Sequence, residues 1–204
     1  MITHYPLGTF EVSAFQQKKA GKDCCGDSYL IKETDEHFIC AVADGLGSGR
    51  PAHEASQSAV KIIEASLGEP LDVIMTKVNE AQGGLRGVVL SMFRIDLKRK
   101  KMQFCGVGNI YLMISTEDGR MIQPLPSQGY MSGRPLKYHV QEFDYPENGW
   151  FAIYSDGIRV QSRHLGDLYE LFSTADQEDI KAYIQSLMIK KTDDDMTLVM
   201  GKIH

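Results

Sequence analysis

Apolar residues along the chain fall into short runs that are typical of buried strands. The clearest runs are residues 37–43 and 150–155, and each stops at an Asp-Gly pair. Further strands are predicted at residues 10–15, 28–32, 87–96, 102–107, 110–114 and 196–203. Because most of these runs follow one another through short turns, the pattern favours antiparallel sheets.

Apolar residues at helical spacing predict two pairs of helices. Pro51 opens the first helix, whose apolar face continues until Gly68 ends it. The other three helices are expected at residues 70–82, 166–172 and 177–188. Strands and helix pairs in this order predict an α+β fold with helices packed outside sheets, in one domain that spans residues 1–204.

Composition narrows the functional classes. Hydrophobic residues make up 43% of the 204 residues and charged residues 24%, so the chain can bury a core without disulfides. The net charge of −5 argues against a nucleic-acid partner. The four cysteines lack zinc-site spacing and indicate free thiols. With no leader-like or membrane-spanning apolar run, we expect a cytoplasmic monomer without a membrane partner.

Aspartates stand next to strand ends at four places. Asp44 and Asp156 each end an apolar strand and precede a glycine, Asp27 comes just before a strand, and residues 193–195 precede the last one. One Asp-Gly pair is typical of a tight turn, but aspartates next to four strand ends predict a cluster. Crowded carboxylates repel unless a cation lies between them, and oxygen ligands without His or Cys suit Mg²⁺, Mn²⁺ or Ca²⁺. Glycine after Asp leaves a backbone carbonyl within reach of an ion.

Other catalytic motifs fail on inspection. The glycine-rich segment 45–49 lacks the Gly-Lys-Ser/Thr of a phosphate-binding P-loop. Gly106 and Gly108 begin a dinucleotide fingerprint, but Tyr111 stands where its third glycine belongs. No G-x-S-x-G elbow is present, and the histidines share no zinc-ligand spacing.

Five motifs together resemble the metal-dependent protein phosphatases of the PPM (PP2C) type, and within them the bacterial SpoIIE-like branch that includes stressosome feedback phosphatases. They are Gly26-Asp27-Ser28, Asp44-Gly45-Leu46-Gly47-Ser48-Gly49, Gly108-Asn109, Ser155-Asp156-Gly157 and Asp194-Asp195-Met196-Thr197. Residues 124–138, PLPSQGYMSGRPLKY, add to the likeness, which covers nearly the whole chain. It implies an αββα sandwich, in which two antiparallel sheets are flanked by helix pairs.

The resemblance also implies the catalytic residues Asp27, Asp44, Asp156 and Asp194, which would hold two divalent cations, Mn²⁺ or Mg²⁺. Asp44 would bridge both ions, and Gly45 would ligate through its carbonyl oxygen. Asp156 and Asp194 would hold one ion, while Asp27 would hold the other or orient water on it. Water activated by these ions would attack the phosphorus atom in line.

Two positions depart from the pattern of the eukaryotic members. Gly26 stands where they have Glu, which implies that one ion is held by fewer side chains and more weakly. Lys22 stands where they have a phosphate-binding Arg. It would contact the substrate phosphate as a point charge without the paired geometry of Arg, although a solvated loop lysine explains it equally well.

The implied substrates are phosphoserine and phosphothreonine on the STAS-domain proteins of the stressosome, of the RsbS and RsbR types. Their hydrolysis would be negative feedback on the general stress response. An inactive pseudophosphatase that binds phosphoproteins is one alternative. A calcium- or magnesium-binding interaction module is another, although residues 193–195 lack the ligand spacing of such a loop. Hydrolysis of a small-molecule phosphate also stays open.

Overall fold

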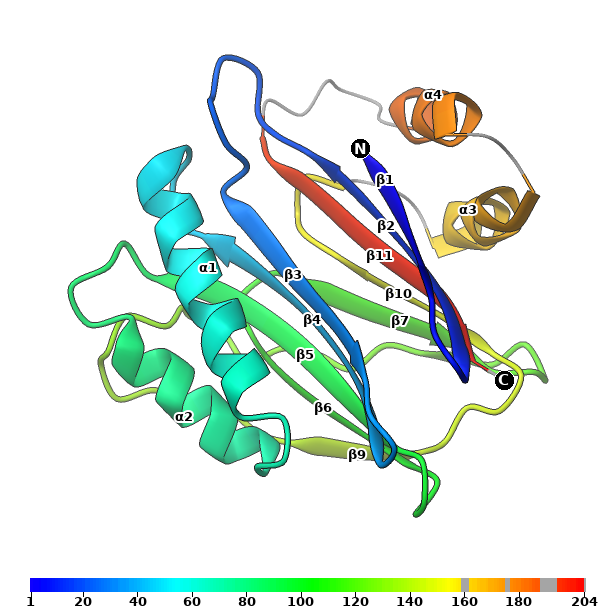
Figure 1. Ribbon diagram of the computed structural model, residues 1–204, viewed down its shortest axis with the longest axis horizontal. Helices are drawn as coiled ribbons and strands as arrows, with labels where there is room; N and C mark the ends of the chain where they lie inside the picture. The colour runs from blue at the N-terminus through cyan, green and yellow to red at the C-terminus, as the bar shows by residue number, and fades with distance from the viewer. Residues whose placement is uncertain (159–161, 175–176, 188–193, 204) are drawn as a thin grey trace.

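Two antiparallel sheets lie face to face in the computed structural model, which describes residues 1–158, 162–174, 177–187 and 194–203 (Figure 1). The six-stranded sheet has the order β1-β2-β11-β10-β7-β8, and the five-stranded sheet has the order β3-β4-β5-β6-β9. The strands are β1 (Ile2–Pro6), β2 (Phe10–Gln17), β3 (Asp27–Glu33), β4 (His37–Gly45), β5 (Val88–Asp96), β6 (Lys101–Val107), β7 (Tyr111–Ser115), β8 (Met121–Ile122), β9 (Gln141–Asp144), β10 (Trp150–Tyr154) and β11 (Met196–Ile203). All strand pairs within the sheets are antiparallel, as the short turns predicted.

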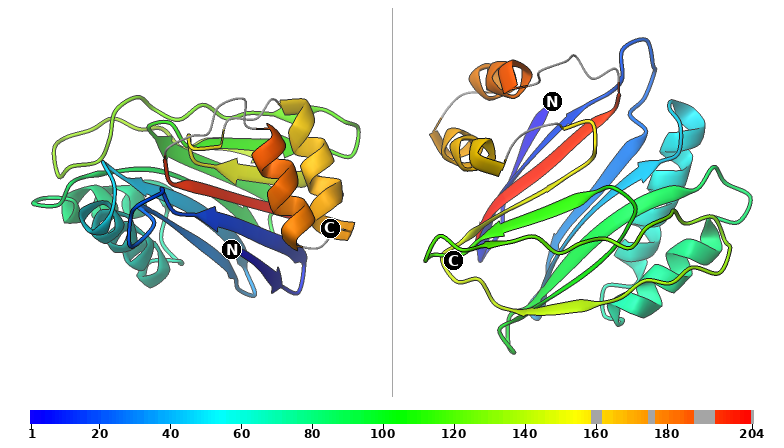
Figure 2. Two further views of the ribbon diagram at one scale, coloured as in Figure 1. Left: turned by 90° about the horizontal axis from the view of Figure 1, so that it is seen from above. Right: turned by 180° about the vertical axis from the view of Figure 1, so that it is seen from behind.

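A helix pair covers the outer face of each sheet (Figures 1 and 2). Helices α1 (Arg50–Ala65) and α2 (Leu71–Ala81) pack on the five-stranded sheet. Helices α3 (Ser162–Thr174) and α4 (Gln177–Leu187) pack on the six-stranded sheet. The αββα sandwich expected from the sequence is therefore confirmed. No helix in the described part of the chain is long and apolar enough to cross a membrane.

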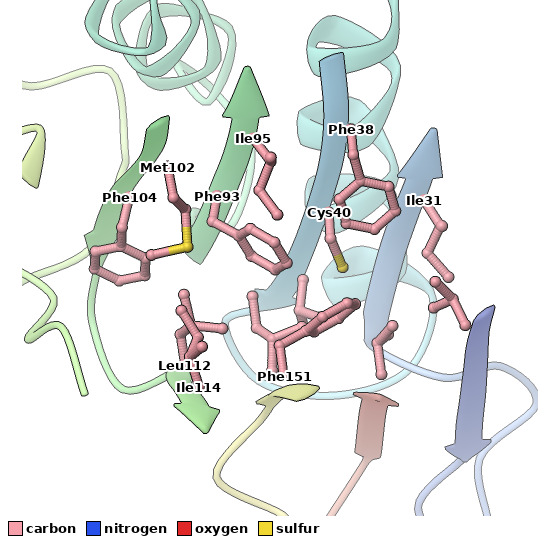
Figure 3. Close-up of a cluster of buried hydrophobic side chains, with 14 of the residues drawn as sticks. Ile31, Phe38, Cys40, Phe93, Ile95, Met102, Phe104, Leu112, Ile114 and Phe151 are labelled. Carbon is pink, nitrogen blue, oxygen red and sulfur yellow. The ribbon is translucent and has the colours of Figure 1, made fainter. Parts of the chain in front are cut away.

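Aromatic side chains fill the space between the two sheets (Figure 3). Phe38 and Phe93 come from the five-stranded sheet, and Phe151 comes from the six-stranded one. The ring of Phe151 lies 4.9 Å from that of Phe93 and 5.7 Å from that of Phe38, centroid to centroid. All three side chains are fully buried, so their packing stabilises the association of the two sheets.

Three strands were not predicted from the sequence: β1, β8 and β9. Each of them lies at the edge of its sheet. Strands β1 and β9 alternate buried or half-buried with exposed positions, and β8 has only two residues. An edge strand is paired on one side only, so it lacks the long apolar run by which the central strands were identified.

Candidate metal centre

The strand ends that carry the predicted aspartates meet at one edge of the sandwich. Asp27 opens β3 and lies directly across from Asp44 of β4. Asp156 and Asp194 belong to the six-stranded sheet. Asp156 follows β10, and Asp194 precedes β11, which pairs with β10. Asp44, Asp156 and Asp194 line one open cleft of about 540 Å³. The convergence expected from the sequence thus holds for these three residues, and the fourth, Asp27, is the cross-strand neighbour of Asp44.

Loops from distant parts of the chain complete the cleft. They are residues 44–47 at the end of β4 and just beyond it, Gly108 and Asn109 after β6, and residues 128–130 between β8 and β9. Asp27 is not among the described residues that line the cleft, because it is buried and only 2% exposed. The cleft therefore has an acidic wall supported by a buried carboxylate.

Both Asp-Gly pairs need their glycine for packing. A Cβ at Gly45 would lie 1.9 Å from the carbonyl oxygen of Ala52 in α1. A Cβ at Gly157 would lie 2.0 Å from the carbonyl oxygen of Asp195. No side chain fits at such distances, so each glycine allows a neighbouring segment to approach the backbone beside a cleft aspartate.

Two polar side chains orient the carboxylates. The hydroxyl of Ser155 donates to Oδ2 of Asp27 at 2.8 Å and accepts the backbone N–H of Thr197 at 3.0 Å. The amide Nδ2 of Asn109 donates to Oδ2 of Asp156 at 2.7 Å. From the sequence, Ser155 and Asn109 were known only as members of motifs, without a role of their own. The structure shows that they donate hydrogen bonds to Asp27 and Asp156, two of the predicted site residues.

The carboxylates are electrostatically crowded. Burial raises the pKa of Asp44, and the negative charges of Asp27, Asp156 and Asp194 raise it further. Burial also raises the pKa of Asp27, although the hydrogen bond from Ser155 acts in the opposite direction. Oδ1 of Asp27 is buried without a hydrogen-bond partner. A hard cation relieves such repulsion and satisfies such an oxygen, so the donor set fits Mg²⁺ or Mn²⁺.

The protein side chains would supply only part of a coordination shell. In the described residues, no three side chains of His, Cys, Asp or Glu are grouped closely enough to hold one metal ion. Backbone carbonyls and water would have to provide the remaining ligands. This is the usual situation for Mg²⁺, which keeps several waters.

Asp195 is a further buried acid that the sequence analysis did not single out. Its Oδ1 accepts the backbone N–H of Lys19 at 2.9 Å, and its Oδ2 lies 2.8 Å from the position of a Cβ at Gly26. A side chain at position 26 would collide with this carboxylate unless the carboxylate moved, so the glycine leaves room for Asp195 in its present position. The signal in the sequence was the pair Asp194-Asp195; the preceding Asp193 lies outside the described residues.

Lys22, the predicted phosphate contact, lies between β2 and β3 and close to the start of α1. Its Cδ is 3.7 Å from the position of a Cβ at Gly49, the N-cap residue of that helix. It is not among the residues that line the cleft in the part of the chain that the structure describes.

Comparison with known proteins places these features in a family. The family model for stage II sporulation protein E (SpoIIE) matches residues 34–204. The phosphoserine phosphatase RsbX of Bacillus subtilis (strain 168) is 34% identical over 193 residues, which cover 93% of this chain and 92% of that protein. A crystal structure of RsbX in complex with magnesium superposes with a TM-score of 0.86 at 31% identity, over 100% of both chains.

A third similar structure is described by the words "The bacterial stressosome: a modular system that has been adapted to control secondary messenger signaling". It has a TM-score of 0.83 and 27% identity over 95% of this chain and 100% of that one. The two stacked sheets between helix pairs are the fold of the PP2C phosphatases. From the family match, the RsbX similarity and this fold together, we conclude that the chain belongs to the SpoIIE family of PP2C-type phosphatases.

Proposed function

We propose that this protein is a metal-dependent phosphoserine/phosphothreonine protein phosphatase that acts on phosphorylated STAS-domain proteins of the stressosome. Its action would be negative feedback on the general stress response. The observation that carries the proposal is the cleft lined by Asp44, Asp156 and Asp194, with Asp27 buried as the cross-strand partner of Asp44. Similarity to a phosphoserine phosphatase over nearly the whole chain supports it.

Two divalent cations, Mn²⁺ or Mg²⁺, are the proposed cofactors. Asp44 would bridge them and the Gly45 carbonyl would ligate, Asp156 and Asp194 would hold one ion, and Asp27 would serve the other. Binding would have to draw these carboxylates closer together than they lie in the described residues. The magnesium in the similar RsbX structure supports this choice. When bound, such ions lower the pKa of water and neutralise phosphoryl charge.

The chain's own residues would orient the reacting groups. Ser155 fixes Oδ2 of Asp27, and Asn109 fixes Oδ2 of Asp156. Lys22 would add a positive charge for the phosphoryl group from its place close to the start of α1. No Ser, Cys or His occurs among the described residues that line the cleft. A phosphoenzyme on Ser, Cys or His therefore has no support in the cleft, and with the aspartates holding the metal ions the proposed acceptor of the phosphoryl group is water.

The partner assignment rests on similarity and on the shape of the site. The similar structure described with the bacterial stressosome supports a stressosome partner. The cleft is open, so it admits a phosphorylated side chain on a protein surface. We further propose that residues 1–204 form one domain that works as a cytoplasmic monomer, without nucleic-acid or membrane partners.

Phosphate release from chelator-stripped protein tests this function. The substrates are a phosphoserine STAS-domain protein and p-nitrophenyl phosphate, each with and without Mn²⁺. Asp44→Asn should abolish release. Asp35→Asn, a change of the same chemistry at an exposed position, is the matched control and should retain it.

The results separate the alternatives. Mn²⁺-dependent release that Asp44→Asn abolishes supports the phosphatase, and a preference for the phosphoprotein supports the stressosome role. Release from p-nitrophenyl phosphate alone favours a small-molecule phosphatase. Phosphoprotein binding without any release from folded protein favours the pseudophosphatase.

A further inference from the structure

We propose that Arg86 and Tyr130 form the substrate rim of the cleft. In this rim, the Arg86 guanidinium contacts the phosphoryl group and the Tyr130 ring supports the phosphorylated polypeptide. The inference rests on the proposed function and adds to it the residues that recognise the substrate.

The backbone of β4 and β5 brings Arg86 beside the cleft, just outside the described residues that line it. Gly45 pairs with Val88 at the end of the ladder, and beyond it the N–H of Leu46 donates to the carbonyl oxygen of Gly87 at 3.0 Å. This register sets Arg86 opposite Gly47, which lines the cleft. Nη1 of Arg86 lies 4.0 Å from the position of a Cβ at Gly47. Because Gly47 has no side chain, the guanidinium has room beside the cleft.

Arg86 is available to bind an anion. It is exposed, and in the described part of the chain no carboxylate pairs with its guanidinium. The proposed metal ions would face the phosphoryl group from the acidic wall, and a cation on the open side would face its remaining oxygens. A guanidinium offers two parallel N–H donors to phosphate oxygens, which a lysine at the same place does not.

Tyr130 lies beside Arg86 on the neighbouring loop. Its side chain is 48% exposed and lines the cleft. Its Cδ2 lies 3.2 Å from the position of a Cβ at Gly87. The next residue, Met131, is fully buried and exchanges two backbone hydrogen bonds with Val88, at 3.0 and 2.8 Å. An exposed aromatic ring on a backbone fastened to the sheet is typical of a binding hot spot.

Asn79 of α2 fixes the same loop from its other side. Its Oδ1 accepts the backbone N–H of Ser132 at 3.1 Å and that of Gly133 at 3.3 Å. Its Nδ2 donates to the carbonyl oxygen of Arg134 at 2.8 Å. The loop that carries Tyr130 is therefore held in place before any substrate binds, which lowers the entropic cost of binding.

The combination of groups favours a phosphorylated protein segment over a small phosphate ester. A small ester would use the guanidinium but would leave the Tyr130 ring and the neighbouring Leu46 without contact. A polypeptide that carries the phosphate would cover both. We therefore commit to a phosphoserine- or phosphothreonine-containing segment of a partner protein as the occupant.

Binding of inorganic phosphate to the Mn²⁺-loaded protein, measured by calorimetry, tests Arg86 without any need for turnover. Arg86→Ala should weaken binding at least tenfold, and Arg86→Lys should fall between this variant and the unchanged protein. Arg99→Ala, at the opposite end of β5, is the matched control and should bind as tightly as the unchanged protein. Phosphate affinity within twofold of the unchanged protein in Arg86→Ala would overturn the phosphoryl contact.

Kinetics on two substrates test Tyr130. Tyr130→Ala should raise the KM for a phosphoserine STAS-domain protein at least fivefold more than the KM for p-nitrophenyl phosphate. An equal change on both substrates would refute a role in holding the polypeptide. If the unchanged protein hydrolyses neither substrate, the proposed function fails. The phosphate-binding result for Arg86→Ala then still decides the inference about the guanidinium.

Discussion

Replacing Asp44 by Asn removes an ionisable carboxyl from the crowded carboxylates, and we expect the metal-free protein to become more stable. The pKa of Asp44 is raised in the folded protein by burial and by the charges of Asp27, Asp156 and Asp194. Its carboxyl therefore contributes stability that is fully present below its unfolded pKa of about 3.9 and is lost as the pH rises through the folded value. At neutral pH, which lies above the unfolded pKa, the metal-free protein has lost part of this stability.

The size of the effect follows from the cross-strand geometry. Asp27 and Asp44 face each other in the β3–β4 pair, where Cβ atoms lie about 5 Å apart. Two unit charges at about 5 Å in an effective dielectric constant of about 20 repel by about 3 kcal/mol. Partial protonation of the pair lowers this, so we expect a gain of about 1–3 kcal/mol. For a chain of this length that corresponds to roughly 3–10 °C in Tm.

Thermal and urea denaturation in excess chelator, between pH 5 and pH 8, measure the gain. The stability of the unchanged protein should fall as the pH rises, whereas that of Asp44→Asn should fall less. Added Mn²⁺ should raise the Tm of the unchanged protein and leave that of the variant nearly constant. Asp35→Asn controls for the loss of an exposed charge. The electrostatic reasoning is refuted if Asp44→Asn is less stable than the unchanged protein in chelator.

Three further substitutions test other parts of the structure. Ser155→Ala removes the hydrogen bond that orients Asp27, so the Mn²⁺ concentration for half-maximal activity should rise about tenfold in a metal titration; an unchanged midpoint would contradict the positioning role. Phe151→Ala leaves a cavity between the sheets and should cost about 3–5 kcal/mol in urea denaturation, whereas a loss below about 1 kcal/mol would show that the core collapses around it. Cys24→Ser and Cys25→Ser should each keep phosphatase activity, because burial raises the pKa of the Cys25 thiol and no covalent step is needed; loss of activity at normal folding would argue for a thiol nucleophile.

Local patterns in the sequence were enough for the central elements of the fold. Strands β4, β5 and β10 carry long apolar runs, and α1 shows an apolar face at helical spacing. The apolar positions of these elements are almost completely buried, so the spacing of apolar residues along the sequence predicts the type of each element. Of the four edge strands, β1, β8 and β9 were missed because they are very short or partly exposed, whereas β3, which is mostly buried, was predicted.

The candidate site was visible in the sequence only as separate motifs. Asp27, Asp44, Asp156 and Asp194 could be named because each stands at a strand end within a motif. Their relative depth could not be predicted, since Asp27 is buried by its contact with Ser155, which lies 128 positions away in the chain. The packing reason for the two glycines could not be predicted either, and it stands beside the expectation that they let the backbone approach an ion. Close backbone packing against α1 and against Asp195 already requires them.

The sequence by itself determined the acidic chemistry of this protein and the strands that carry it, because residue type and local periodicity are properties of neighbouring positions. Only the tertiary structure decided which groups share a cleft. It brought Arg86 to the rim through the register of β4 and β5, and it fastened Tyr130 beside it through Asn79 and Val88. Such placements depend on backbone hydrogen bonds and packing between distant segments, and no local pattern in the chain encodes them.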